Sequence, residues 1–253
     1  MKVQDQAHLE DEVTQQQGNP RGPLAAFRRS TAGRIWSSTV GKKAVMGITG
    51  AMMLLYVIVH MVSNLKVFIE PASLDRYAMW LRELLSGLLG HEGLVWVFRA
   101  GLLAAVLLHM TAAIQLARRA RAARPDGYQR RSRVQGSYAA RTMRWGGVIL
   151  ALFIVYHLLD LTTGDLNPHG VHGEVYRNVV ASFQRWYVTL FYALSVIALG
   201  FHIRHGLWSG LQSLGASNAA RQRALKLLAL GTALFITFGF LSVPFAVLTG
   251  LLR

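Results

Sequence analysis

Residues 44–62, AVMGITGAMMLLYVIVHMV, form one uninterrupted apolar run in which the only acidic or basic side chain is His60. At a rise of about 1.5 Å per residue, a helix over this run spans most of the roughly 30 Å of hydrocarbon in a bilayer. An ionisable side chain at that depth is costly unless it has a partner, so it indicates a functional site. The run therefore predicts a membrane span and a site within it.

A histidine also lies within three further apolar runs. They place His109 in LVWVFRAGLLAAVLLHMTAAI (94–114), His157 in WGGVILALFIVYHLL (145–159) and His202 in WYVTLFYALSVIALGFHI (186–203). A fifth apolar run near the C-terminus contains no histidine. We predict an all-α integral membrane protein whose five transmembrane helices form one bundle. The predicted spans are about 44–68, 93–117, 143–163, 186–209 and 224–252.

The regions outside the runs complete the predicted domain organisation. Residues 1–34 are expected to be a polar cytoplasmic tail with a basic lead-in, and residues 35–253 the membrane domain. Residues 1–23 lack the short apolar core of a signal peptide, so we expect the first span to remain uncleaved. The absence of cysteine excludes disulfides, thiolate metal sites and cysteine-linked haem.

Charge is distributed unevenly among the segments that connect the spans. Arg and Lys number six within 21–43, nine within 118–144 and four within 204–226. The remaining connections, 66–92 and 160–185, contain more acidic than basic residues. Because Lys and Arg accumulate on the cytoplasmic side, the N-terminus is predicted inside and the C-terminus outside. The net charge of +15 is therefore assigned to basic membrane loops rather than to nucleic-acid binding.

This orientation groups the four histidines by depth. His60 and His157 lie about 14–16 residues along outward-running spans, which places both in the outer half of the membrane. His109 and His202 lie about 16 residues along inward-running spans, which places both in the inner half. A haem bound by two imidazoles requires such a pair on two helices, and the two layers differ by roughly 15 Å in depth. We predict two non-covalent b haems that relay electrons, with these four histidines as the axial ligands of the iron.

Residues near the histidines suit this prediction. Small side chains on the faces of His109 and His202 leave room for a flat ring, although such residues are also common in helix packing. They are Ala105, Ala112, Ala113, Ser195, Gly206 and Ser209. Ser63 and Asn64 follow His60 by about one turn, where they are candidates to hydrogen-bond the backbone or the second nitrogen of a ligand histidine.

Two other classes of protein stay open at this point. An ion or proton transporter uses buried histidines as relays, but it also predicts acidic residues near the bilayer middle, whereas Asp160 and Asp165 lie at the predicted outer edge. A haem-free scaffold would keep the helices without needing four histidines at paired depths. The other histidines are predicted to be solvated, except for His205, which competes with His202 as a ligand. The solvated set is His8, His91, His169 and His172.

Five stretches carry a family resemblance through their order and spacing. They are WSSTVGKKAVMGITG (36–50) leading to HMVSNL (60–65), HMTAAIQLARRARAARPDGY (109–128), RWGGVILALFIVYHLLDL (144–161), VYRNVVASFQRWYVTLFYALSVIALGFHIRHGLWSGLQSLG (175–215) and GFLSVPFAVLTG (239–250). Over residues 35–252 the chain resembles the single-chain, five-helix, di-haem cytochrome b anchor subunit of succinate:quinone oxidoreductases. No single motif is decisive.

The resemblance implies roles for the histidines. His60 and His157 would bind the haem distal to the soluble subunits, and His109 and His202 the proximal haem. The spacing of His202 to Gly206 and Gly215 matches the family's fourth ligand. His205 fits less well and is a candidate to contact a haem propionate or a quinone. Relatives often have glycine where this chain has Ser63, which is a departure that removes no ligand.

The resemblance also implies partners and a reaction. A flavoprotein with covalent FAD and an iron–sulfur subunit would dock on the basic cytoplasmic face. The chain has no cysteines for clusters and no dinucleotide-binding glycine motif, so it does not oxidise succinate alone. As the anchor of succinate dehydrogenase, which is complex II of the tricarboxylic acid cycle, it would pass electrons through haem to menaquinone or ubiquinone. The expected location is the bacterial plasma membrane. A quinol:fumarate reductase of the same architecture stays open, as does a higher oligomer of the complex.

Two groups of residues are candidate quinone or proton sites. The first lies at the inner end of the first span, where a basic, snorkelling helix start is the alternative explanation. Its members are Arg34, Ser37, Ser38 and Lys43. The second is an outer group of Glu83, His91 and Glu92, for which an ordinary acidic loop is the alternative.

Overall fold

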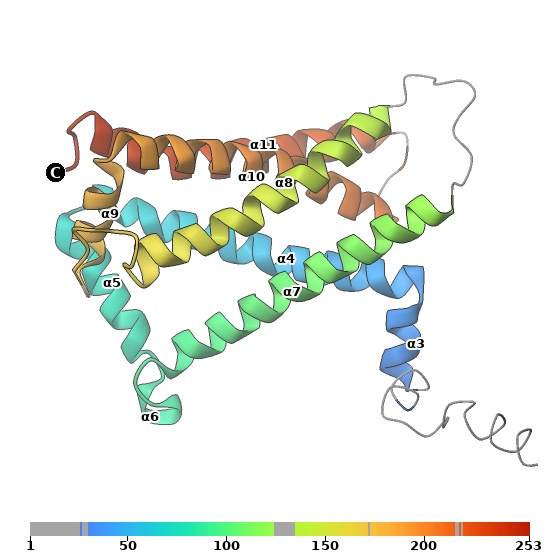
Figure 1. Cartoon of the computed structure of the whole chain (residues 1–253), viewed down its shortest axis with the longest axis horizontal. Helices are drawn as coiled ribbons and strands as arrows, with labels where there is room; N and C mark the ends of the chain where they lie inside the picture. The colour runs from blue at the N-terminus through green and yellow to red at the C-terminus, as the bar shows by residue number, and fades with distance from the viewer. Residues whose placement is uncertain (1–25, 27–29, 124–134, 172, 216–217, 219) are drawn as a thin grey trace, which may run out of the picture. The chain divides into compact units, whose positions relative to one another are not determined.

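The computed structural model describes residues 26, 30–123, 135–171, 173–215, 218 and 220–253. Of the predicted tail, residues 1–25 and 27–29 therefore lie outside the described residues, as does His172. The chain divides into two units, Met1–Val45 and Met46–Arg253. The helices are α3 (Thr31–Ser37), α4 (Thr39–Asn64), α5 (Pro71–Glu83), α6 (Ser86–Leu89), α7 (Gly93–Ala122), α8 (Gln135–His157), α9 (Val175–Phe183), α10 (Trp186–Ser213) and α11 (Gln222–Leu248) (Figure 1).

Five helical segments are long and apolar enough to cross a membrane. They are Thr39–Phe68, Gly93–Ala122, Met143–Thr162, Trp186–Ser213 and Gln222–Leu248. The five predicted spans are thus confirmed as helices, with differences at their ends. The last helix ends at Leu248 rather than near residue 252, because Gly250 has a φ of 75°, a left-handed conformation that terminates helices.

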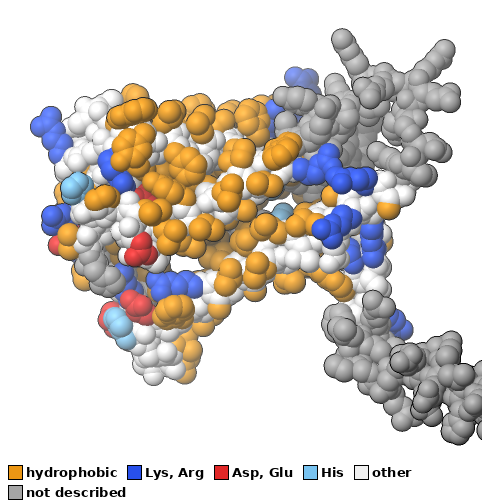
Figure 2. All heavy atoms as spheres, in the orientation of Figure 1, with side chains coloured by type: hydrophobic (Ala, Val, Ile, Leu, Met, Phe, Trp, Pro, Cys, Tyr) orange, Lys and Arg blue, Asp and Glu red, His pale blue; other side chains and the backbone are white. Residues whose placement is uncertain are grey.

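Large apolar side chains point away from the protein along these segments. Leu103 in α7, Phe201 in α10 and Phe238 in α11 are each more than 60% exposed. Hydrophobic side chains cover the face drawn in Figure 2 along the long helices, and acidic side chains gather at the end that carries α5, α6 and α9. Exposing so much apolar surface to water would be unfavourable at about 25 cal/mol per Å². The surface fits a multi-pass membrane protein.

Glycine and alanine allow the closest helix packing. Gly200 of α10 faces the Thr237 hydroxyl of α11, and Gly239 of α11 faces the thioether of Met61 in α4. Met61 is fully buried, as expected where two helix backbones approach closely. One core cluster combines Ile203 of α10 with Ala233 and Ile236 of α11, and Leu54, Val57 and Ile58 of α4 pack against it.

The segments between the spans contain helices that the sequence analysis did not predict. Pro71 begins α5 at a position where its missing N–H costs nothing. In α9, the Tyr176 backbone N–H donates to Asp75 Oδ1 of α5 at 3.0 Å, and the Tyr176 hydroxyl donates to the Arg253 carbonyl at 3.1 Å. These bonds collect α5, α9 and the last described residue at one end of the second unit (Figure 1).

Candidate functional site

The four intramembrane histidines lie in two facing pairs. The ring centres of His60 in α4 and His157 in α8 are 5.9 Å apart, with the rings at 81°. Those of His109 in α7 and His202 in α10 are 6.4 Å apart, with the rings at 55°. The structure thus brings together the residues that the depth argument pairs. We call them the His60–His157 pair and the His109–His202 pair.

The separation within each pair suits two imidazoles on opposite sides of one metal ion. Metal–imidazole nitrogen bonds are about 2 Å long and each ring centre lies about 1 Å beyond its nitrogen, so the ring centres of two such ligands are roughly 6 Å apart. Among the described residues, no group of three or more His, Cys, Asp and Glu is placed to hold a metal. Two imidazoles without a third side-chain ligand suit a metal whose remaining ligands come from a macrocycle, as in haem.

Aromatic side chains surround the His60–His157 pair. Tyr56 stacks on His60 with ring centres 5.4 Å apart, and Phe240 of α11 lies at 5.8 Å. Phe153 lies 5.7 Å from His157, and Tyr192 of α10 lies 6.0 Å from it. This aromatic wall keeps water away from the two imidazoles.

A backbone carbonyl orients His109. Its Nδ1 lies 3.0 Å from the Met46 carbonyl oxygen, in the second unit of the chain. Because a carbonyl only accepts, Nδ1 must carry the proton, which leaves the lone pair on Nε2 for a metal. The Thr49 hydroxyl lies 3.3 Å from the same Nδ1. This arrangement is typical of ligand histidines, whose second nitrogen usually donates to a protein acceptor.

His202 differs from its neighbour His205 in its surroundings. His202 faces His109, and its buried Nδ1 has no hydrogen-bond partner among the described residues. A buried polar atom left without a partner in the protein is a place where a bound group or an ordered water belongs. His205 instead packs against Trp208, with ring centres 5.9 Å apart. The geometry therefore favours His202 over His205 as the partner of His109.

Ser63 does not support a ligand histidine directly, because its hydroxyl donates to the Tyr77 hydroxyl of α5 at 3.1 Å. Ala105 and Ala112 in α7 are buried, as is Ser195 in α10, whose hydroxyl donates to the Phe191 carbonyl. These three small residues thus lie inside the protein, whereas Ala113, Gly206 and Ser209 are half-buried. Helix packing accounts for such residues as well as a flat ligand does.

The inner quinone candidates all lie in the first unit. The Ser37 hydroxyl donates to the Arg34 carbonyl at 2.8 Å and the Ser38 hydroxyl to the Ile35 carbonyl at 2.9 Å. Lys43 is exposed. Lys42, which was not a predicted site residue, is 2% exposed, donates to the Trp36 carbonyl and lies 4.9 Å above the Trp36 ring. The Ser37 and Ser38 side chains are thus engaged in local contacts, and the Ser38 hydroxyl also accepts from the Gly41 backbone N–H at the start of α4.

The outer candidates form ion pairs at the surface. His91 Nδ1 lies 2.9 Å from Glu83 Oε1, and Arg82 Nε lies 3.1 Å from Glu92 Oε1. The Glu83 and His91 side chains are both more than half exposed. Exposed pairs of this kind contribute little to stability, so they fit a solvated connection between α5 and α7.

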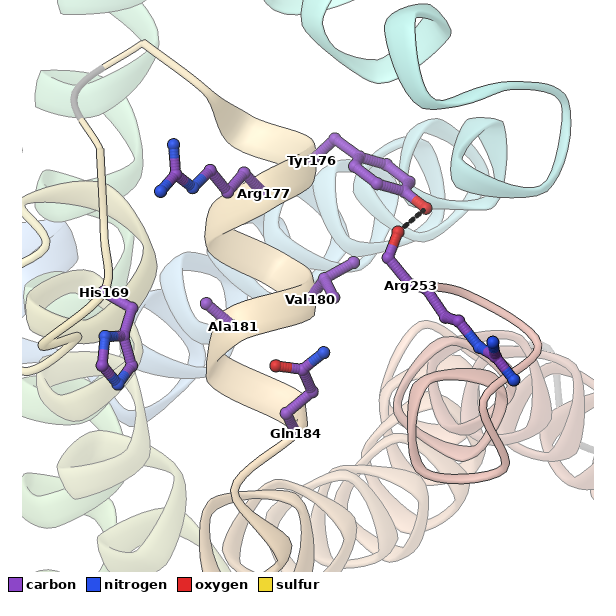
Figure 3. Close-up of a pocket in the computed structure, with 7 residues that line it drawn as sticks. All are labelled: His169, Tyr176, Arg177, Val180, Ala181, Gln184 and Arg253. Atoms are coloured by element: carbon purple, nitrogen blue, oxygen red, sulfur yellow. Dashed lines mark hydrogen bonds between the residues drawn. The ribbon is translucent and has the colours of Figure 1, made fainter.

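A pocket of about 380 Å³ lies beside α9, at the end of the second unit where α5, α9 and Arg253 meet (Figure 3). Its lining residues are His169, Tyr176, Arg177, Val180, Ala181, Gln184 and Arg253. Arg177 and His169 lie on one side of α9 and Arg253 on the other, so their charges do not converge on one centre. The geometry assigns no ligand to this pocket.

The sequence analysis missed a buried polar cluster next to His157. Asp160 is fully buried, and its carboxylate accepts hydrogen bonds from Ser182, Arg185 and Tyr192. The sequence did offer one signal, because Asp160 directly follows an apolar run. That acidic residue was interpreted only as the edge of a span. Its partners are distant in sequence, so no local pattern joins them.

Comparison with protein families identifies a relationship for the middle of the chain. Residues 118–241 match the family described as succinate dehydrogenase/fumarate reductase transmembrane subunit. The matched segment includes His157 and His202 and excludes His60 and His109. Comparison with curated proteins and with solved structures finds no match for the chain.

Proposed function

Residues 118–241 match the succinate dehydrogenase/fumarate reductase transmembrane subunit family, and from this premise we propose that the chain is a di-haem cytochrome b anchor of such a complex. In this proposal it receives electrons from an iron–sulfur subunit and passes them through two b haems to membrane quinone. The match of this segment supports a role as the membrane anchor subunit of such a complex, in association with its catalytic subunits. The haems, the direction of the reaction and a bacterial plasma membrane as the location are parts of the proposal.

The two histidine pairs carry the proposal. In each pair, residues on two different helices face one another at the separation suited to two axial ligands. Haem bound in this way supplies one-electron transfer and has no open position for oxygen. The chain's own contribution is to hold four imidazoles in place. The Met46 carbonyl orients His109, and the aromatic wall around the His60–His157 pair excludes water.

The charge pattern supports an orientation with the basic connections on the cytoplasmic side. The ends of α7 and α10 that carry Arg118, Arg119 and Leu214 would then face the soluble subunits, while α5, α6 and α9 would lie outside. The basic face is suited to docking an iron–sulfur subunit. Arg34, Ser37, Ser38, Lys43 and His205 stay candidates for quinone or propionate contacts.

The transporter alternative is less well supported by the surroundings of Asp160. This carboxylate is paired with Arg185 at 2.8 Å and lies at the end of a span. A proton relay in a transporter would instead place an acidic group along the middle of the bundle.

The haem content of the purified complex tests the proposal. We expect two b-type haems per chain from a pyridine haemochrome assay and a reduced-minus-oxidised spectrum. His109→Ala and His202→Ala should each remove one haem, His60→Ala and His157→Ala the other, and His205→Ala neither. A colourless wild-type complex would refute the proposal, and loss of haem in His205→Ala but not in His202→Ala would reassign that ligand.

The direction of the reaction needs a separate measurement. We propose succinate oxidation, so the assembled complex should reduce quinone with succinate faster than it reduces fumarate with quinol. The ratio of the two rates under matched conditions decides between succinate dehydrogenase and quinol:fumarate reductase.

A further inference from the structure

The cluster around Asp160 lies at the end of α8 that carries His157. The helix changes there to a π-helical turn, Leu158–Thr162, a feature that is rare and frequently found at functional sites. Within this turn Asp160 is fully buried. A buried carboxylate is stable as an anion only if it is paired and hydrogen-bonded.

Three side chains from the region of α9 and α10 satisfy this carboxylate. Arg185 donates to Oδ1 at 2.8 Å, and its guanidinium is 16% exposed. The Ser182 hydroxyl and the Tyr192 hydroxyl both donate to Oδ2, the latter at 2.9 Å. Arg185 also donates to the Ser182 hydroxyl at 3.2 Å and to the Leu166 carbonyl at 3.0 Å. Both oxygens of the carboxylate therefore accept hydrogen bonds within a connected network.

The Tyr192 hydroxyl joins this network to His157. Its oxygen lies 3.4 Å from His157 Nδ1. Because the hydroxyl proton is directed to Asp160, only the lone pairs of that oxygen are available to the imidazole. His157 Nδ1 must then be the donor, which leaves the lone pair on Nε2. A charged acceptor beyond the tyrosine also strengthens the bond that His157 donates, since hydrogen bonds in a chain polarise one another.

We propose that Asp160, acting through Tyr192, is a positioning residue that fixes the tautomer of His157 and makes its Nε2 a stronger electron donor to iron. This inference rests on the proposed haem-binding function. The two histidine pairs differ in the acceptor that supports a ligand. His109 donates to the neutral carbonyl of Met46, whereas His157 donates into a network that ends in a carboxylate. Supporting groups of this kind tune the redox potential of the metal that a histidine binds.

Redox titration of both haems in the purified complex tests this role. Tyr192→Phe removes one oxygen and leaves the contacts of Arg185 and Ser182 with Asp160. The substitution should raise the midpoint potential of the haem at the His60–His157 pair, because His157 becomes a weaker electron donor and stabilises ferric iron less. The midpoint potential of the other haem should stay unchanged. The loss of one haem in His157→Ala identifies which signal belongs to this pair.

For a second variant, the proposal predicts a shift of the midpoint potential in the opposite direction. Ser182→Ala removes one donor to Asp160, so the carboxylate should accept more strongly from Tyr192 and the same potential should fall. Tyr156→Phe is the matched control, because its ring lies 6.0 Å from that of Tyr192 and its hydroxyl is not part of the network; both potentials should stay at their wild-type values.

The outcomes separate this inference from the function on which it rests. A wild-type complex without haem refutes the proposed function. Two haems in the wild type with an unchanged potential in Tyr192→Phe refute the inference alone. If Tyr192→Phe does not assemble, Ser182→Ala decides: a lowered potential supports the role of Asp160, and an unchanged or raised one overturns it.

Discussion

Among single residues, Gly50 illustrates how closely α4 approaches a candidate ligand. A Cβ at this position would lie 3.2 Å from His109 Cε1 and 3.5 Å from its Nδ1. The distance to Cε1 is short for a carbon contact, so a side chain here would press on the imidazole. At Gly47, one turn earlier in the same helix, an added Cβ would meet open space. The two glycines form a matched pair for an experiment.

We predict that Gly50→Ala shifts the absorption spectrum or the potential of the haem at the His109–His202 pair while both haems are retained. The ring must move by a few tenths of an ångström, which weakens its bond to Met46. The control, Gly47→Ala, should leave both haems unchanged and stabilise α4 by up to about 1 kcal/mol through helix propensity. Identical spectra of Gly50→Ala and Gly47→Ala would contradict the observed contact.

At the scale of elements, the Asp160–Arg185 ion pair joins the end of α8 to the start of α10. Asp160→Ala should destabilise the protein by about 3 kcal/mol, because it leaves a largely buried guanidinium without its counter-ion. Asp165→Ala should change stability by no more than about 0.5 kcal/mol, since Asp165 is exposed. Thermal unfolding of both variants in the same detergent measures the difference. Equal melting temperatures would exclude a stabilising role for the pair.

The contact between α4 and α11 gives a second prediction at this scale. Gly239→Ala adds a methyl group against Met61, which is fully buried and has little room to move. Overpacking of this kind costs about 1–3 kcal/mol, so the apparent melting temperature should fall. The control is Gly231→Ala, at a position in the same helix where an added Cβ would have nothing within 4 Å. The melting temperature of this variant should stay level or rise.

The elements themselves were predictable to different degrees. The five long helices follow from hydropathy and length, whereas α5, α6 and α9 were missed in segments that were interpreted only by their charge. Their stability depends on contacts with other elements, such as the bond from the Tyr176 N–H to Asp75. A short helix that is stabilised by a residue far away in sequence has no strong local pattern.

For the whole molecule, the chain's lack of cysteine makes its orientation in the membrane measurable. Leu88 in α6 is 81% exposed and Leu214 after α10 is 80% exposed, so each can be replaced by a single labelling site. We predict that Leu88→Cys reacts with a membrane-impermeant maleimide in intact cells, and that Leu214→Cys reacts only after permeabilisation. The reverse pattern would show that the positive charges lie outside and would invert the proposed docking face.

The sequence by itself determined the five long apolar helices and the pairing of the four histidines. Both depend on local quantities: the number of apolar residues needed to cross hydrocarbon, and the rise of a helix per residue. Only the tertiary structure decided what each imidazole contacts, including the Met46 carbonyl beside His109 and Tyr192 with Asp160 beside His157. Those contacts depend on the rotation of each helix about its axis and on a π-helical turn. Packing between distant segments sets both, so no single stretch of sequence contains them.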